Sequence, residues 1–188
     1  MPSFLVYDSA TGQPLFVQQS RNPPTLPEGH AFIAAADGTA IARGDVVTDG
    51  ALTRRPATLD ELRAAKRAAA ETRFRSVIAG GFGWAGALYQ IDSGSQARIA
   101  AMGGLALASL TAPDAPAWDP EFCWIAGDNS RVHMDARTAC GFAQAVARHV
   151  GACILNLRGI KDAVADATDA AALDTIDVTA GYPGSGAP

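Results

Sequence analysis

The feature that most constrains the fold is a long apolar repeat near the C-terminus. Its positions are separated alternately by four and three residues, and they are Ala139, Ala143, Val146, Val150, Cys153, Leu157, Ile160 and Val164. A heptad pattern sustained over this length predicts a helix whose apolar seam packs against another helix. We expect one helix over residues 136–165, about 45 Å long at ~1.5 Å per residue, with Asp135 as its N-cap.

The sequence leaves the continuity and the covering of this helix open. Gly141, Gly151 and Gly159 lie inside it, and each costs up to ~1 kcal/mol of helix stability relative to alanine. The seam can be covered by other elements of the same chain or by other copies, for example in a homotrimer. Periodicity alone is compatible with both arrangements.

A second helix is predicted over residues 59–78. The segment "TLDE" places Glu61 three residues after Thr58, which is the spacing of a capping box, and Pro56 lies just outside it. The apolar stripe is thin and consists of Leu59, Leu62, Ala65, Ala69 and Val77. Because the other faces are basic or alanine, we expect a connecting or oligomer-forming helix, with Leu59 and Leu62 as interface candidates.

The first 56 residues have the composition of a small β module. "FLVYDSATGQPLFVQQS" contains two apolar, partly alternating runs around the turn-forming residues 9–12, which predicts a hairpin. Further short strands are expected over residues 30–56, separated by Asp-Gly and Gly-Asp turns. No recognisable chemical motif occurs here, so we predict a docking module.

The remaining segments predict an α+β domain. "GGFGWAGALYQID" indicates a hairpin that turns near Gly86, and an apolar helix capped by Ser93 or Ser95 should follow, ending near Leu110. Thr168 should cap a short last helix. We therefore predict an α+β protein with a small N-terminal β module and a helical domain that has two short β-hairpins and one long C-terminal helix. Its expected parts are the β module at 1–56, the connecting basic helix at 57–79, the α+β domain at 80–178 and a flexible tail at 179–188.

The segment "IAGDNSRVHMD", residues 125–135, contains the residue types of acid, base and nucleophile chemistry. A working pair of Ser130 and His133 must come within ~3 Å. In a strand these residues point to opposite faces, roughly 10 Å apart, because they are an odd number apart. We therefore interpret the segment as a hairpin turning at Asp128-Asn129, and predict no catalytic residues and no enzymatic activity.

A two-residue turn fixes the expected register of this hairpin, with Trp124 opposite His133. Cys123, Ile125, Val132 and Met134 then share the core face, and Trp124, Ala126, Arg131 and His133 share the other face. Trp124, Arg131 and His133 are accordingly predicted to contact a partner. The seam residues Val146, Val150, Cys153, Leu157, Ile160 and Val164 are further interface candidates.

Neither a metal site nor a cofactor site is predicted. His149 and Cys153 lie on one side of the long helix, but Cys140 lies on the opposite side, and two ligands do not make a site. "AGGFGWAG" lacks the lysine and the serine or threonine of a phosphate loop, as well as the strand-to-helix context of a dinucleotide fingerprint. The three widely spaced cysteines contain no CxxC pair and indicate core thiols in a reducing cytoplasm.

Composition narrows the classes of partner. The formal net charge of −4 argues against a general binder of nucleic acid or of anionic membranes. No stretch of ~18 uncharged apolar residues is present, and the N-terminus lacks the basic region and long apolar run of a signal peptide. We expect a soluble, unexported protein.

From Thr58 onward the order of these signals resembles a domain of unknown function that recurs in tail and tail-fibre-associated proteins of tailed bacteriophages. The segments that carry the resemblance are Tyr89-Gln90-Ile91-Asp92, Ser95, Ile99, Trp124, Asp128-Asn129, Val132 and "GIKDAVADATDAAALDTID". The N-terminal "FLVYDSATGQ" also looks like the small β modules that begin many phage tail-fibre and fibre-assembly proteins. The resemblance implies a context and no established activity.

Three functions are weighed on this basis. We expect a non-enzymatic structural or adaptor protein of a phage tail tip, baseplate or fibre, located in the virion and, during assembly, in the host cytoplasm. It would bind other tail proteins and form a homo-oligomer, such as a trimer, through the heptad seam. The alternative is a tail-fibre assembly chaperone absent from the finished virion. A hydrolase that uses His133 with Asp128 or Asp135 is the third and most distant hypothesis.

Overall fold

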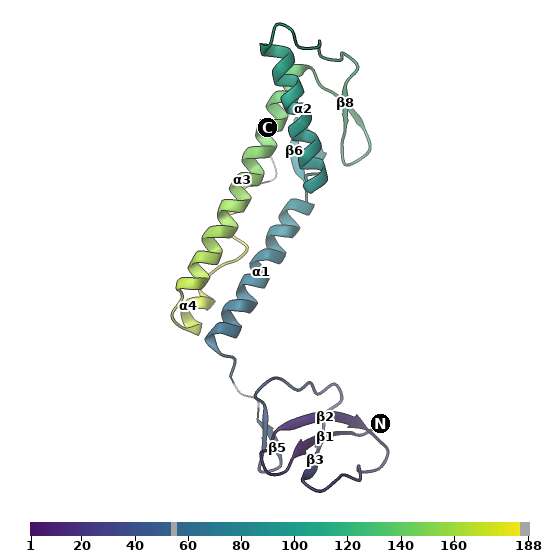
Figure 1. Ribbon diagram of the computed structural model, residues 1–188, viewed down its shortest axis with the longest axis vertical. Coiled ribbons are helices and arrows are strands. Elements are labelled where there is room, and N and C mark those ends of the chain that lie inside the picture. Colours follow the sequence, from purple (N-terminus) through teal and green to yellow (C-terminus); the bar gives the residue numbers. More distant parts are fainter. Residues whose placement is uncertain (54–55, 185–188) are drawn as a thin grey trace. The chain divides into compact units, whose positions relative to one another are not determined.

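The protein consists of two compact units. The computed structural model describes residues 1–53 and 56–184. The units are Met1–Thr58 and Leu59–Pro188. The first contains strands, and the second contains helices with two short hairpins (Figure 1), which confirms the predicted α+β class. Every helix among the described residues is too short or too polar to form a membrane span.

The first unit is a three-stranded antiparallel sheet with a separate hairpin. Its strands are β1 (Ser3–Asp8), β2 (Pro14–Gln19), β3 (His30–Ala35), β4 (Val46–Thr48) and β5 (Ala51–Thr53). The sheet order is β2-β1-β3, and β4 pairs with β5. The predicted first turn forms because the Asp8 carboxylate accepts hydrogen bonds from the amides of Ala10 and Thr11.

The second unit is organised around one long helix. Its elements are α1 (Leu59–Ala79), β6 (Phe82–Trp84), β7 (Ala87–Tyr89), α2 (Ser93–Thr111), β8 (Cys123–Ile125), β9 (Arg131–His133), α3 (Ala136–Asp166) and α4 (Ala170–Asp174). In Figure 1, α2 lies along the N-terminal half of α3 and α1 along its C-terminal half. The prediction of one long helix is confirmed, because α3 continues through all three of its glycines.

Two core clusters cover the heptad seam within the chain. The first lies between α2, α3 and the hairpins, and it contains Tyr89, Ile91, Ile99, Met102, Phe142 and Val146 among its buried residues. The second lies between α1, α3 and α4 and consists of Ala70, Ile160, Val164, Ala167 and Leu173. Cys153, between the two clusters along α3, is also fully buried. Intramolecular packing therefore fills the seam.

Helix caps agree with the sequence at one helix and differ at two. The Asp135 side chain accepts a hydrogen bond from the Thr138 amide at 2.7 Å, which confirms it as the N-cap of α3. The cap of α2 is Asp92, not Ser93 or Ser95, and that of α4 is Asp169, not Thr168. In both cases an aspartate next to the predicted residue supplies the carboxylate.

The register of the β8–β9 hairpin differs from the prediction by one residue. Trp124 pairs with Val132, and Cys123 pairs with His133. The loop is longer than two residues, since the Ala126 amide donates to the Ser130 carbonyl at 2.9 Å and Asn129 adopts a φ of 65°. A shift of one residue reverses the faces of one strand relative to its partner: here the faces of β8 are exchanged, and those of β9 are as predicted. Trp124, Ala126, Val132 and Met134 therefore face the core, and Cys123, Ile125, Arg131 and His133 face away.

The segment predicted as a flexible tail begins with residues that are packed. The Asn156 side chain donates to the Ala180 carbonyl at 3.0 Å, and Tyr182 packs against the second core cluster. Gly181 has a φ of 78°, which favours glycine, and lies directly against the Asn156 side chain. Residues 180–182 are thus held on α3, while 185–188 lie outside the described residues.

Candidate functional site

A row of aromatic side chains forms a wall beside α2. The ring centroids of Trp118 and Phe122 are 4.9 Å apart, and those of Phe122 and Trp124 are 6.5 Å apart. The ring centroid of Trp124 in turn lies 6.1 Å from that of Phe142 of α3. The Trp118 indole N–H donates to the Met134 carbonyl at 2.9 Å, which fixes the loop between α2 and β8 on the hairpin. The wall is therefore held both by packing and by a hydrogen bond.

An apolar groove lies between this wall and α2. Its volume is about 540 Å³. The lining residues are Arg98, Ala101, Met102, Leu105, Ala108, Ser109, Ala115, Pro116, Ala117, Trp118, Asp119, Phe122 and Trp124. Carbon dominates this surface, and the charged groups are confined to Arg98 and Asp119. We call it the α2 groove.

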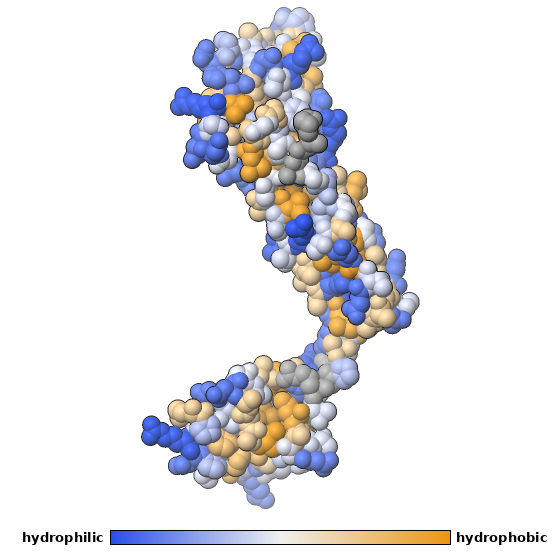
Figure 2. Space-filling view, turned by 180° about the vertical axis from the view of Figure 1, so that it is seen from behind, coloured by the Kyte–Doolittle hydropathy of each residue, from blue (hydrophilic) through white to orange (hydrophobic). Residues whose placement is uncertain are grey.

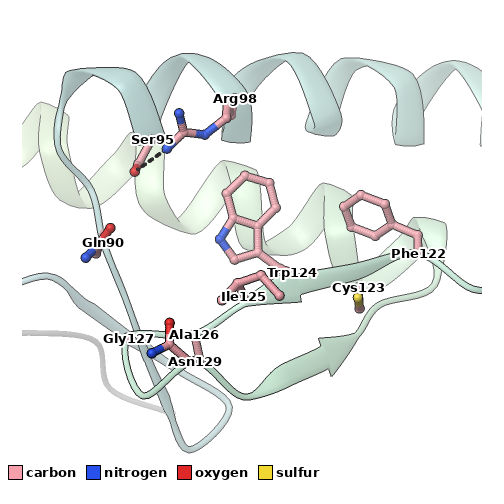
Figure 3. A pocket seen from close by; sticks show the side chains of 10 residues that line it. All are labelled: Gln90, Ser95, Arg98, Phe122, Cys123, Trp124, Ile125, Ala126, Gly127 and Asn129. Carbon is pink, nitrogen blue, oxygen red and sulfur yellow. Dashed lines mark hydrogen bonds between the residues drawn. The ribbon is translucent and has the colours of Figure 1, made fainter.

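A second, more polar pocket of about 390 Å³ adjoins the α2 groove at Arg98 (Figure 3). In Figure 3, Ser95 and Arg98 belong to α2, Trp124 belongs to β8, and Phe122 immediately precedes β8. Arg98 Nη2 donates to Ser95 Oγ at 3.1 Å, and Ser95 Oγ donates to Asp92 Oδ2 at 2.8 Å. Hydrogen bonds from the Ser95 hydroxyl and amide lower the pKa of Asp92. The carboxylate thus serves the helix cap, and the exposed guanidinium is held at the junction of the two pockets.

The carboxylates of the hairpin segment are used in turns and caps. The Asp128 carboxylate accepts from the Ser130 amide at 2.9 Å, and hydrogen bonds from Ser130 lower the pKa of Asp128. Hydrogen bonding by the Thr138 amide lowers the pKa of Asp135. Ser130 and His133 are both exposed. At neutral pH these aspartates are ionised, and their carboxylates accept hydrogen bonds from backbone amides. An ionised carboxylate has no proton to donate and therefore does not suit a general acid.

The predicted interface residues fall into different environments. Arg131 and His133 are exposed on the outer face of the hairpin, whereas Trp124 belongs to the aromatic wall and not to their face. The structure therefore separates the three residues that were predicted to act together. Of the seam candidates, Val146, Cys153, Ile160 and Val164 are buried, and Val150 and Leu157 are half-buried against the two clusters. On α1, Leu59 and Leu62 pack against the second cluster.

His149 and Cys153 form a buried pair on α3. Cys153 Sγ lies 3.8 Å from His149 Nε2. Burial lowers the pKa of His149 and raises the pKa of Cys153, so both groups are neutral at pH 7. A cavity of about 310 Å³ adjoins His149 and is also lined by Arg73 and Tyr182. Among residues 1–53 and 56–184, groups of three or more metal-binding side chains are not found.

Sequence reasoning missed the α2 groove, although one signal pointed to it. The stretch from Ile99 to Thr111 contains no charged residue, yet α2 is long enough to expose more than one face. Leu105 is 70% exposed, and Leu107 and Leu110 are about half exposed. A helix that is apolar all round normally has cover on all sides. The lack of charge from Ile99 to Thr111 therefore marks the part of α2 that carries the groove.

Comparison with known proteins gives a family assignment. Neither a curated protein nor a solved structure matches the chain. Residues 61–180, which are more than half of the sequence and include the α2 groove, match a family described as a domain of unknown function, DUF4376. The chain therefore belongs to the DUF4376 family.

Proposed function

We propose that this protein is a non-enzymatic structural or adaptor component of a bacteriophage tail, acting at the tail tip, baseplate or fibre through protein–protein contacts. The observation that carries the proposal is the α2 groove with its exposed Leu105, together with the exposed Leu107 and Leu110 elsewhere on α2. Contiguous apolar surface of this kind is characteristic of protein-binding sites. Aromatic residues and an arginine, which line this groove, are also enriched at such interfaces.

The first unit offers a separate surface for attachment. Phe16 and Phe32 both lie opposite Val6 of the central strand and therefore share one face of the sheet. Phe16 is 49% exposed and Phe32 is 37% exposed. Apolar side chains are also gathered in a patch on the view of this unit in Figure 2. Two contact surfaces on two units suit a protein that joins partners.

The phage context comes from the order of sequence signals and from the N-terminal β module described above. In this proposal the protein resides in the virion tail and passes through the host cytoplasm during assembly. Chemistry at the titratable groups is not required, because the aspartates of the hairpin serve as caps and turns.

Mass spectrometry of purified particles tests the proposal. We expect peptides of this chain at a constant ratio to the tail proteins. A chain present in infected cells but absent from washed particles would contradict the structural role and favour the assembly chaperone. Absence of cross-links to any tail protein in cells and in particles would contradict both.

A matched pair of variants tests the role of the groove in this function. Leu105 on α2 and Leu155 on α3 are 70% and 73% exposed, but only Leu105 lines the groove. We expect Leu105→Glu to lower the amount of protein in particles and Leu155→Glu to leave it unchanged. Equal incorporation of the two variants would exclude the groove as the attachment surface.

A further inference from the structure

The outward side of α2 lacks a cover. One side packs on α3 so closely that a Cβ added at Gly103 would overlap the Ala143 side chain. On the outward side a Cβ on Gly104 would meet nothing within 4 Å, and Leu105 and Leu107 beside it are exposed. Because the helix carries no charge from Ile99 to Thr111, this side offers few groups that water can solvate well. A protein surface is therefore expected to cover it.

We propose that a second copy of this chain covers α2, in a two-fold dimer whose two α2 helices run antiparallel. The inference rests on the proposed function, since it names the partner of the α2 groove. A two-fold contact requires one patch to complement itself. The patch does so because Leu105 both protrudes from α2 and lines the groove, so that each copy supplies its Leu105 to the groove of the other.

Charge complementarity selects the antiparallel arrangement. Arg98 is the one charged residue of α2 and lies near its N-terminal end. The loop that follows the C-terminal end contains Asp114, Asp119 and Glu121 and no lysine or arginine, and all three acidic residues are exposed. Antiparallel helices bring each Arg98 to the acidic loop of the other copy. Parallel helices would bring like charges together.

Along its length, α2 is compatible with a two-fold axis at the level of Gly104. Arg98 precedes Gly104 by six residues, and Leu110 follows it by six, so the helix extends about 9 Å on each side at ~1.5 Å per residue. An antiparallel pair centred there brings Arg98 of one copy to the Leu110 end of the other, next to the acidic loop. The absence of a side chain at Gly104 permits close approach of the two backbones.

The experiment measures self-association of the full chain by sedimentation velocity over a range of concentrations. We expect a concentration-dependent dimer for the natural sequence and for Leu155→Glu, and a monomer for Leu105→Glu. Circular dichroism of each variant verifies that it keeps the helix content of the natural chain. A natural chain that stays monomeric, a trimer, or equal loss of dimer in both variants would overturn the inference.

A charge exchange tests the orientation of the helices. Arg98→Glu should raise the dissociation constant at least about tenfold, because each introduced glutamate would face an acidic loop, and Asp114→Arg with Asp119→Arg should do the same. Mixed in equal amounts, the two variants should form a heterodimer in which both contacts are opposite in charge. Failure of the mixture to dimerise would overturn the antiparallel arrangement.

Particle mass spectrometry detects the chain in the tail independently of its self-association. A chain that is monomeric in solution and a chain that is absent from the tail are therefore distinguishable results.

Discussion

The two halves of α3 are stabilised by different kinds of contact. The N-terminal half packs its Phe142 against Tyr89, Trp84 and Trp124, with ring centroids 4.6–6.2 Å apart. The C-terminal half packs against α1, whose one fully covered residue in this cluster is Ala70. Buried aromatic side chains remove far more apolar surface from water than alanine does. We infer that the N-terminal half contributes most of the free energy of folding of this unit.

Polar contacts supplement the thin apolar stripe of α1. The Lys161 ammonium lies 2.6 Å from the Glu71 carboxylate, and Arg63 Nη2 donates to the Ala167 carbonyl at 2.8 Å. At the other half, α2 has more apolar surface than α3 covers. One uninterrupted heptad seam is therefore covered by two different helices, α1 with polar contacts and α2 with excess apolar surface. The periodicity of the sequence specifies the seam but not which elements pack on it.

The largest expected effect is that of Phe142→Ala. Phe142 is fully buried and touches three aromatic rings, so removing its ring should lower the free energy of unfolding by about 3–5 kcal/mol. Urea unfolding followed by tryptophan fluorescence measures the change. Leu155→Ala on the exposed side of the same helix is the control. A decrease in the free energy of unfolding below about 1 kcal/mol for Phe142→Ala would contradict the inference that the N-terminal half of α3 contributes most of the folding free energy.

Leu173→Ala should act on the C-terminal half alone. Leu173 of α4 is 3% exposed in the second cluster, and its truncation should cost about 2–3 kcal/mol. Hydrogen exchange should show faster exchange in α1, α4 and the end of α3, with the α2 amides still protected. Equal acceleration in α2 would indicate one cooperative core in place of two.

Gly103→Ala tests the close contact between α2 and α3. The added methyl would overlap the Ala143 side chain, and overpacking of this kind costs about 1–3 kcal/mol. Gly159→Ala is the matched control, because nothing lies within 4 Å of its Cβ position in α3. We expect the control to raise stability by up to ~1 kcal/mol through helix propensity. A change in the free energy of unfolding of the same sign for both variants would contradict the close contact between Gly103 and Ala143.

The helices of this unit could be predicted because their determinants are local. Asp135 caps α3 through the amide three residues later, and the heptad spacing requires no knowledge of distant residues. The face of the β8–β9 hairpin depends instead on the length of its turn. The segment Asp128-Asn129 suits both a two-residue turn and the longer loop that forms, and one residue of difference moved Trp124 to the core side.

The α2 groove could not be predicted because it depends on contacts between distant segments. Trp118 is positioned by the Met134 carbonyl, sixteen residues later in the sequence. The loop before β8 has a composition that fits many conformations, and only the packing of Phe122 between the two tryptophans selects one. The uncharged stretch from Ile99 to Thr111 is a local signal for an exposed apolar surface, but it does not specify the shape of that surface.

Acid should destabilise the protein through His149, which lies at the boundary between the two halves. Burial lowers its pKa below the ordinary value of 6.5, so the unfolded chain binds a proton first as the pH falls. Stability should therefore decrease as the pH drops from about 6.5 toward the folded pKa. Melting temperatures measured at about one pH unit above, at and about one unit below the ordinary pKa check this trend. His149→Gln should flatten it, and the exposed His133→Gln should not.

The smallest expected effect is that of the ion pair between Glu71 and Lys161. The hydrogen bond and charge of Lys161 lower the pKa of Glu71, so the contribution of the pair is present above about pH 4.5 and is lost as the pH falls through the folded pKa. Both side chains are partly exposed, at 46% and 34%, and salt screens such pairs. Lys161→Met should lower the melting temperature slightly at low salt, with less effect at high salt. A loss as large as that of Leu173→Ala would mean that charge, and not apolar packing, holds α1 on α3.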